Sequence, residues 1–235
     1  MIRRLLRERD IDSCRTASIQ MNYFAHGRSF LAAPYFLVGT AVPDLIRVAA
    51  RKSRVREKHA QEFLADENPA VAAIAAGIAQ HHVDDAWFHK TSVFAQLSLE
   101  FTVLARNALP DDEGFRPSFL GHILVELLLD SALIAENKSQ LDSYYQALAD
   151  VDADLVQAAV SGMATHPVER FSECLRTFQC LRFLYDYLDD VKLCYRLNQV
   201  MRRVGLPELP GSFVGLIPRM RSTVVDQRHA LFTPD

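Results

Sequence analysis

The chain has 235 residues, of which 49% are hydrophobic and 23% charged, and its formal net charge is −3. This length allows one substantial core or at most two small ones, and the near-neutral charge argues against a protein whose main role is to coat duplex nucleic acid. With only 9 Gly and 10 Pro, and no convincing alternating strand pattern, the sequence predicts an all-α chain.

The first 20 residues differ from the apolar segment that opens at Met21. Their charges stand where a signal peptide needs an apolar stretch, so we interpret them either as a short extra helix or as lying before a true start at Met21. No apolar run is expected to cross a membrane, and the four cysteines, without a CxxC pair, indicate reduced thiols. We therefore expect a cytoplasmic protein that is not transmembrane, with one helical domain over 21–235.

The segment 21–45 predicts one short helix around His26, a break near Pro34 and a second element that ends at Pro43 and Asp44. His26 lies in an apolar setting, where a lone histidine is usually a satisfied core residue. Asp44 has two interpretations, an N-cap of the helix that would follow or a metal ligand.

A highly charged stretch, RKSRVREKHAQEF, occupies residues 51–63. His59 is its only nitrogen ligand suited to a metal, and on its own it would more often be a solvated surface residue. Asn68 and Pro69 then start a long helix that is expected to run to about Lys90, and its Ala and Gly residues allow neighbouring helices to approach closely.

Three side chains of the long helix, His81, Asp85 and His89, are spaced at i, i+4 and i+8 and so project from one stripe. At about 1.5 Å per residue, the two histidines lie roughly 12 Å apart along the axis, too far to share one ion, whereas Asp85 is within about 6 Å of each. The stripe predicts at least two metal positions with Asp85 between them. Imidazole and carboxylate suit Zn, Fe, Mn or Ni better than Ca or Mg. The alternative is an ordinary histidine cluster.

A second helix, FLGHILVELLLDSALIAEN, carries His122 and Glu126 at i and i+4, with Asp130 one turn further on. Burying two carboxylates among Leu, Ile and Val is costly unless they are paired or bind a cation. The alternative is a structural polar network. Asp130 is also a candidate to orient a ligand histidine.

The remaining chain predicts further helices without a repeat or a phosphate-binding loop. We expect residues 92–109 to continue the preceding helix and 110–117 to break it. The later elements are a helix over 151–167 stopped by Pro167, a helix pair over 168–205, a turn-rich connector over 206–218 and a last helix over 219–232.

Taken together, the candidate ligands resemble those of the zinc-dependent phospholipase C and single-strand-specific nuclease superfamily over roughly residues 21–135. The segments MNYFAHG, GTAVPDL and AAGIAQHHVDD are also similar to acyl carrier protein phosphodiesterases, an HD-like helical group. The resemblance implies an all-α bundle around a buried site of up to three metal ions that hydrolyses phosphodiesters. The eight residues that carry it are, in order, His26, Asp44, His59, His81, Asp85, His89, His122 and Glu126.

The resemblance also distributes these ligands among the ions. One ion would be held by Asp44, His59, His81 and Asp85, and a second by His89, His122 and Glu126. A third would be shared by Asp85 and His26 together with a free N-terminal amine. Here the chain departs from the superfamily, because His26 lies well inside the chain.

The expected function is that of a metal-dependent phosphodiesterase with two or three divalent ions, Zn or else Mn, Fe or Ni. Two ions of this kind activate a water molecule and neutralise phosphoryl charge, and Asp85 is the expected catalytic residue that orients the nucleophile. The substrate would be a small-molecule or lipid phosphodiester or a phosphopantetheinyl carrier protein. Two alternatives are a di-iron protein that activates oxygen and a non-catalytic module with a structural metal site.

Overall fold

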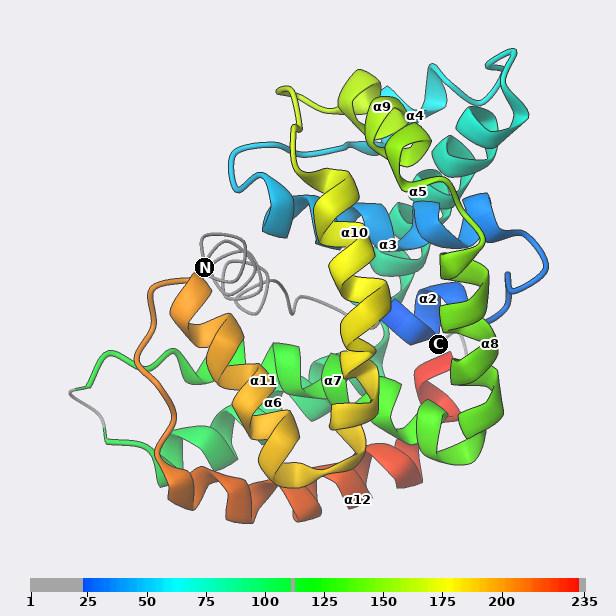
Figure 1. Cartoon of the computed structure of the whole chain (residues 1–235). Helices are drawn as coiled ribbons and strands as arrows, with labels where there is room; N and C mark the ends of the chain where they lie inside the picture. Colours follow the sequence, from blue (N-terminus) through cyan, green and yellow to red (C-terminus); the bar gives the residue numbers. More distant parts are fainter. Residues whose placement is uncertain (1–22, 111–112, 233–235) are drawn as a thin grey trace, which may run out of the picture. The chain divides into compact units, whose positions relative to one another are not determined.

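The computed structural model describes residues 23–110 and 113–232 (Figure 1). Within these ranges the chain is helical and has no strand, which confirms the predicted all-α class. The predictions made for residues 1–20, including Cys14, lie outside the described residues. The three described cysteines, Cys174, Cys180 and Cys194, form no disulfide bond with one another.

The contacts within the chain group its residues into two compact units, each assembled from segments that are far apart in the sequence. The described residues of unit 1 are 26–83 and 139–182, and those of unit 2 are 23–25, 84–138 without 111–112, and 183–232. The boundary crosses one long helix between Val83 and Asp84. The single domain over 21–235 stays a prediction.

Unit 1 contains most of the long central helix. Its elements are α3 (Pro34–Ala49), α4 (Glu57–Gln61), α5 (Pro69–Phe88) up to the boundary, α8 (Lys138–Ala149), α9 (Ala153–Met163) and α10 (Phe171–Leu181). Helix α10 packs against both α3 and α9 (Figure 1). The short helix α2 (Tyr23–Gly27) contributes His26 to this unit.

Helices α3 and α5 approach each other at two glycines. A Cβ atom at Gly77 would meet the backbone oxygen of Phe36 and lie 2.9 Å from the Cα atom of Gly39. The position therefore needs glycine, and the expected close approach at the long helix is confirmed. Ile74 and Ile78, one turn apart on α5, are fully buried.

The predicted helix end at Pro43 and Asp44 is wrong, since α3 runs through both residues to Ala49. Pro43 cannot donate a helical hydrogen bond, but the residues around it, Leu37 to Ile46, are all buried. Burial of this apolar stretch outweighs the cost of the proline. Asp44 is consequently a buried residue in mid-helix, and the N-cap interpretation is wrong.

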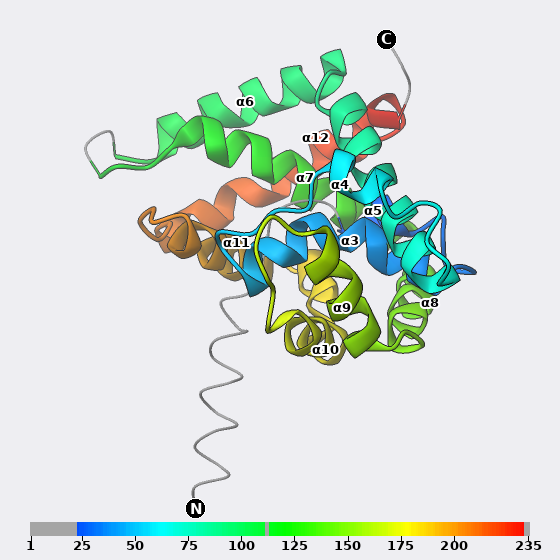
Figure 2. The same cartoon turned by 90° about the horizontal axis from the view of Figure 1, so that it is seen from above.

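Unit 2 is built on two long helices that lie side by side, α6 (Ser92–Ala108) and α7 (Pro117–Glu136) (Figure 2). The other elements are η1 (Phe183–Leu188), α11 (Asp190–Arg203), η2 (Gly211–Leu216), α12 (Ile217–Gln227) and η3 (Ala230–Phe232). Gly121 lets α7 come close to α6, because a Cβ atom there would meet the Ser98 oxygen and lie 2.8 Å from the Thr102 nitrogen.

Helix α7 is long and apolar enough to cross a membrane by length and composition alone. However, 78% of the relevant window is buried inside the protein, as in a core helix. Its packing against α6, η1 and α12 explains this burial.

The predicted boundaries of the other helices need smaller changes. Residues 92–109 do not continue the preceding helix, because the chain turns at 89–91 and Thr91 caps a new helix. Helix α9 ends at Met163, before Pro167. The predicted helix pair over 168–205 is α10 and α11, joined by the short η1, and the last helix starts at Ile217.

Candidate metal centre

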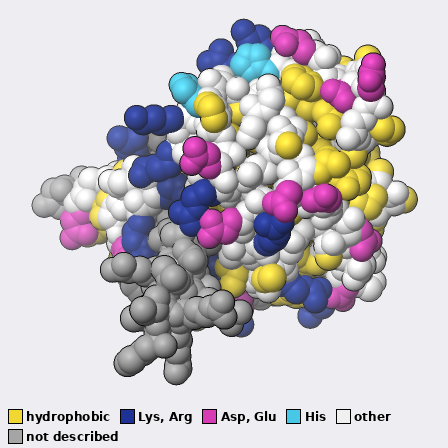
Figure 3. Space-filling model, turned by 45° about the horizontal axis from the view of Figure 1, so that its top comes forward, with side chains coloured by type: hydrophobic (Ala, Val, Ile, Leu, Met, Phe, Trp, Pro, Cys, Tyr) yellow, Lys and Arg dark blue, Asp and Glu magenta, His cyan; other side chains and the backbone are white. Residues whose placement is uncertain are grey.

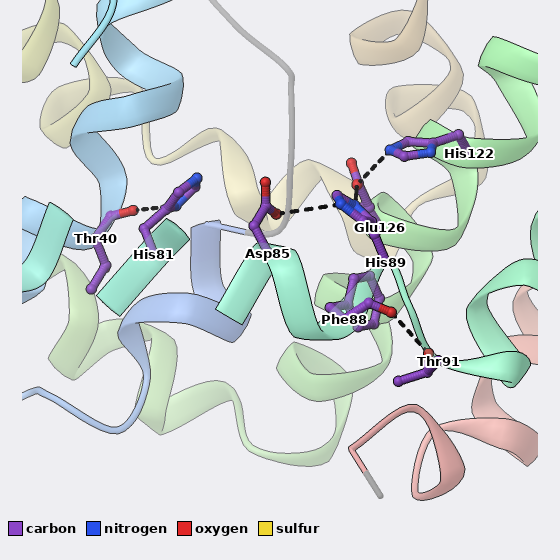
Figure 4. A network of polar contacts seen from close by, with 8 residues as sticks. All are labelled: Thr40, His81, Asp85, Phe88, His89, Thr91, His122 and Glu126. Atoms are coloured by element: carbon purple, nitrogen blue, oxygen red, sulfur yellow. Dashed lines mark hydrogen bonds and ion pairs between the residues drawn. The ribbon is translucent and has the colours of Figure 1, made fainter. Parts of the chain in front are cut away.

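The side chains of His81, Asp85 and His89 leave successive turns of α5, as the spacing predicts (Figure 4). His89 follows the last residue of α5, but its backbone N–H still donates to the Asp85 carbonyl oxygen at 3.1 Å. The helical geometry therefore extends to His89, and the predicted row of His81, Asp85 and His89 on one helix face is present. Its two ends contact different elements, His81 in unit 1 and His89 in unit 2.

In unit 2, His89, His122 and Glu126 form one compact cluster. The His89 Nε2 atom lies 2.8 Å from Glu126 Oε1, and the His122 Nε2 atom lies 3.0 Å from the same oxygen (Figure 4). The two imidazole rings are 4.7 Å apart between centroids. One ligand atom from each residue lies within 4.8 Å of the others, so the three side chains could hold one metal ion.

Glu126 is the most deeply buried member of this cluster, with an exposed fraction of 0%. Its Oε1 atom accepts both histidine contacts, whereas its buried Oε2 atom has no hydrogen-bond partner among the described residues. A buried carboxylate oxygen without a partner is costly, and a bound cation would compensate it. The donor set of two imidazoles and one carboxylate fits Zn, Mn, Fe or Ni.

Charges and hydrogen bonds within the cluster shift the pKa values of Glu126 and His89. Burial raises the pKa of Glu126, but the hydrogen bonds and charges of His122 and His89 outweigh it, so the pKa is lowered from its usual value. Burial lowers the pKa of His89, and the hydrogen bond and charge of Glu126, with the charge of Asp85, more than offset this and raise it. Without a metal, the cluster is therefore held by a pairing of opposite charges.

Asp85 extends the cluster along α5. Its Oδ1 atom lies 4.0 Å from His89 Nδ1, on the side of the ring opposite to the Glu126 contact. About a quarter of the Asp85 side chain is exposed. A carboxylate in this position can orient the imidazole of His89 or hold a water molecule.

Aromatic packing fixes both imidazoles of the unit 2 cluster. The Phe94 ring, from the first turn of α6, lies 4.8 Å from the His89 ring and 5.0 Å from the His122 ring between centroids. Thr91 places Phe94, because its hydroxyl donates to the Phe88 carbonyl at 2.8 Å and accepts from the Phe94 N–H at 3.3 Å (Figure 4). Sequence reasoning missed both residues, although a threonine three residues before phenylalanine at a helix start is a recognisable N-cap.

In unit 1, His26 and His81 form a second histidine pair, with ring centroids 4.4 Å apart. The His81 Nδ1 atom donates to the Thr40 carbonyl at 2.9 Å, which leaves Nε2 as the atom with a free lone pair. Burial, followed by the charges of His26 and His82, holds the pKa of His81 well below its usual value. His81 is thus a neutral imidazole, the form that binds a metal, and Asp85 stands one turn further along α5.

Two predicted ligands lie outside the histidine and carboxylate groups that could hold a metal among the described residues. Asp44 is buried in α3, and His59 is half-buried in α4. Their ligation stays a prediction. By contrast, the implied trio of His89, His122 and Glu126 is brought together, although binding of an ion there also stays a prediction.

Other polar residues have structural roles. Asp130 accepts hydrogen bonds from the backbone N–H groups of Phe24 at 3.0 Å and Ala25 at 2.8 Å, so it anchors the first turn of α2. This corresponds to the structural alternative for Asp130, with backbone N–H groups as its partners. His82 contacts the Val55 carbonyl at 3.0 Å.

Comparisons with known protein families, with curated proteins and with solved structures found no match to this chain. The superfamily resemblance consequently rests on the pattern of candidate ligands alone.

Proposed function

We propose that the protein is a metal-dependent phosphoester hydrolase that acts on phosphodiesters. The observation that carries the proposal is the fully buried Glu126, which receives two imidazoles on one oxygen and has no hydrogen-bond partner for the other among the described residues. Structural hydrogen bonding alone does not account for such an oxygen, whereas a cation ligand does.

Divalent ions at such sites supply Lewis acidity and lower the pKa of water toward neutrality. The chain's own residues would then hold the metal and orient the attacking water. His89 and His122 present Nε2 atoms held by Glu126 and packed against Phe94. The carboxylate of Asp85, partly exposed beside His89, would position the attacking water and accept its proton. Asp85 is therefore the proposed catalytic residue.

The proposed metal is zinc, with Mn, Fe or Ni as alternatives, and the proposed setting is the cytoplasm. The resemblance implies two substrate classes, a small-molecule or lipid phosphodiester and a phosphopantetheinyl carrier protein. A site of two imidazoles and one carboxylate also suits iron, so oxygen activation is the rival chemistry that an experiment must separate from hydrolysis.

The test begins with metal analysis of protein purified without chelator, followed by hydrolysis of bis(4-nitrophenyl) phosphate. We expect bound transition metal and metal-dependent turnover. Asp85→Asn should lower kcat by about a hundredfold or more at an unchanged metal content, as for loss of a general base. Asp84→Asn, the same change one residue earlier on α5, is the matched control and should retain activity.

Three outcomes would count against the proposal. If the purified protein contains no metal, the proposed metal-dependent hydrolysis is wrong. If Asp85→Asn has wild-type turnover at equal metal content, Asp85 is not the catalytic residue. Coloured, iron-loaded protein that consumes O₂ without hydrolysing the phosphodiester would favour the rival chemistry.

A further inference from the structure

The most basic part of the chain lies in unit 1. Residues 47–58, called the basic segment below, contain six basic side chains and one acidic side chain, Glu57. The segment thus carries a net charge of +5, and the rest of the chain must carry −8 to give the total of −3. All six basic side chains are exposed, and they are Arg47, Arg51, Lys52, Arg54, Arg56 and Lys58.

Four of these cations, Lys52, Arg54, Arg56 and Lys58, form no ion pair with any acidic residue in the part of the chain that the structure describes. Other arginines of unit 1 behave differently. Arg176 pairs with Asp154 at 2.6 Å and Arg182 with Asp142 at 2.6 Å. These four side chains therefore carry positive charge that no acidic residue of the described part of the chain pairs with.

Arg54 lies close enough to Arg47 for the two positive charges to repel each other. Its pKa is lowered, first by partial burial and second by the positive charge of Arg47. The Arg54 guanidinium is held in place, because it donates to the carbonyl oxygens of Arg51 at 2.7 Å and Ser53 at 2.6 Å. Like charges kept at close range raise the local potential and attract an anion.

Hydrogen bonds to Thr165 hold the backbone of the basic segment at Arg54. Arg54 exchanges two hydrogen bonds with Thr165, from its N–H to the hydroxyl at 3.1 Å and from the Thr165 N–H to its carbonyl at 2.9 Å. Ser53 and Val55 are buried, whereas Arg54 and Arg56 are exposed. In an extended chain this alternation places both arginines on one side, about 7 Å apart. Figure 3 shows a face on which Lys and Arg side chains lie near histidines, with Asp and Glu side chains among them.

The types of exposed side chain in the basic segment indicate which class of partner it can bind. Every exposed residue from 51 to 58 is charged, and none is apolar or aromatic. A protein interface needs an apolar or aromatic centre, and an interfacial membrane site needs apolar side chains to insert. Interfaces with nucleic acid are more polar and far more positive, and unpaired arginines and lysines contact phosphates.

We propose that the basic segment binds the sugar–phosphate backbone of a nucleic-acid strand, without reading its sequence. The proposal is independent of the metal centre and of the proposed hydrolysis. Four phosphate contacts, one for each of the cations without an ion pair, give a dependence of log K on log salt of about −3 for a single strand.

The test is fluorescence anisotropy with a labelled 20-nucleotide oligothymidylate over 50 to 300 mM NaCl, in the presence of EDTA so that no hydrolysis occurs. We expect salt-sensitive binding. Arg54→Gln with Arg56→Gln should weaken it about tenfold at the lowest salt and reduce the slope by about 1 to 2.

The control is the same change of charge in unit 2, Arg106→Gln with Lys138→Gln, because both side chains are exposed there. Circular dichroism checks that every variant is folded. Binding that is equally weakened by both double variants, or no binding at 50 mM NaCl, would overturn the proposal. Anionic phosphatidylserine vesicles bound as tightly as the oligonucleotide would overturn the assignment to nucleic acid.

Discussion

Replacing Glu126 by glutamine tests the candidate metal centre most directly. The variant keeps the shape of the side chain and removes its charge, in a position with an exposed fraction of 0%. The amide oxygen can still accept hydrogen bonds from the histidines, but the NH₂ group, a donor, then takes the place of Oε2, which has no hydrogen-bond partner among the described residues. Glutamine is also a poor ligand for a transition metal compared with carboxylate.

The expected loss follows from the two histidine contacts. A hydrogen bond to a charged group contributes about 1.5–3 kcal/mol, and the His89 contact at 2.8 Å counts in full because His89 is largely buried. The His122 contact adds little, since 42% of that side chain is exposed. Metal-free Glu126→Gln should therefore lose about 2–3 kcal/mol of unfolding free energy, or roughly 4–12 °C in Tm.

The assay is thermal unfolding followed by circular dichroism, in EDTA and again with added Zn²⁺. A metal at a hundred times its Kd stabilises the wild type by about 2.7 kcal/mol, and Glu126→Gln should lose most of this gain. Glu136→Gln, at the exposed end of the same helix with Arg228 at 3.9 Å, is the control and should change little. A Glu126→Gln variant as stable as the wild type and equally stabilised by zinc would refute the reasoning.

Two further predictions concern packing and pH. Gly77→Ala should lower the unfolding free energy, measured in urea, by about 1–3 kcal/mol, because the added Cβ atom would meet the Phe36 backbone. The control is Gly215→Ala, which should be near neutral because nothing lies within 4 Å of its added Cβ atom. Equal stability of the two variants would contradict the close approach of α3 and α5. In EDTA, the raised pKa of His89 gives stability that is full below 6.5 and lost as pH rises through the raised value. The lowered pKa of Glu126 gives stability that is full above 4.5 and lost as pH falls. The stability difference between wild type and His89→Gln should therefore be larger at pH 5.5 than at pH 9, and a difference that grows toward pH 9 would show the wrong sign.

The sequence by itself determined the helical class, the long helices α5 and α7 and the row of His81, Asp85 and His89. These features depend on local periodicity, since residues four apart share a face in any α-helix. Glu126 could also be picked out, because a carboxylate within an apolar helix has to be compensated.

Only the tertiary structure decided which side chains meet. His89 and Glu126 are 37 residues apart, and their 2.8 Å contact depends on the turn at Thr91 and on the packing of α6 against α7 at Gly121. Burial likewise carried α3 through Pro43, against its local signal. Periodicity sets angles within one helix, whereas distances between helices are set by the packing of their surfaces, which a local pattern does not contain.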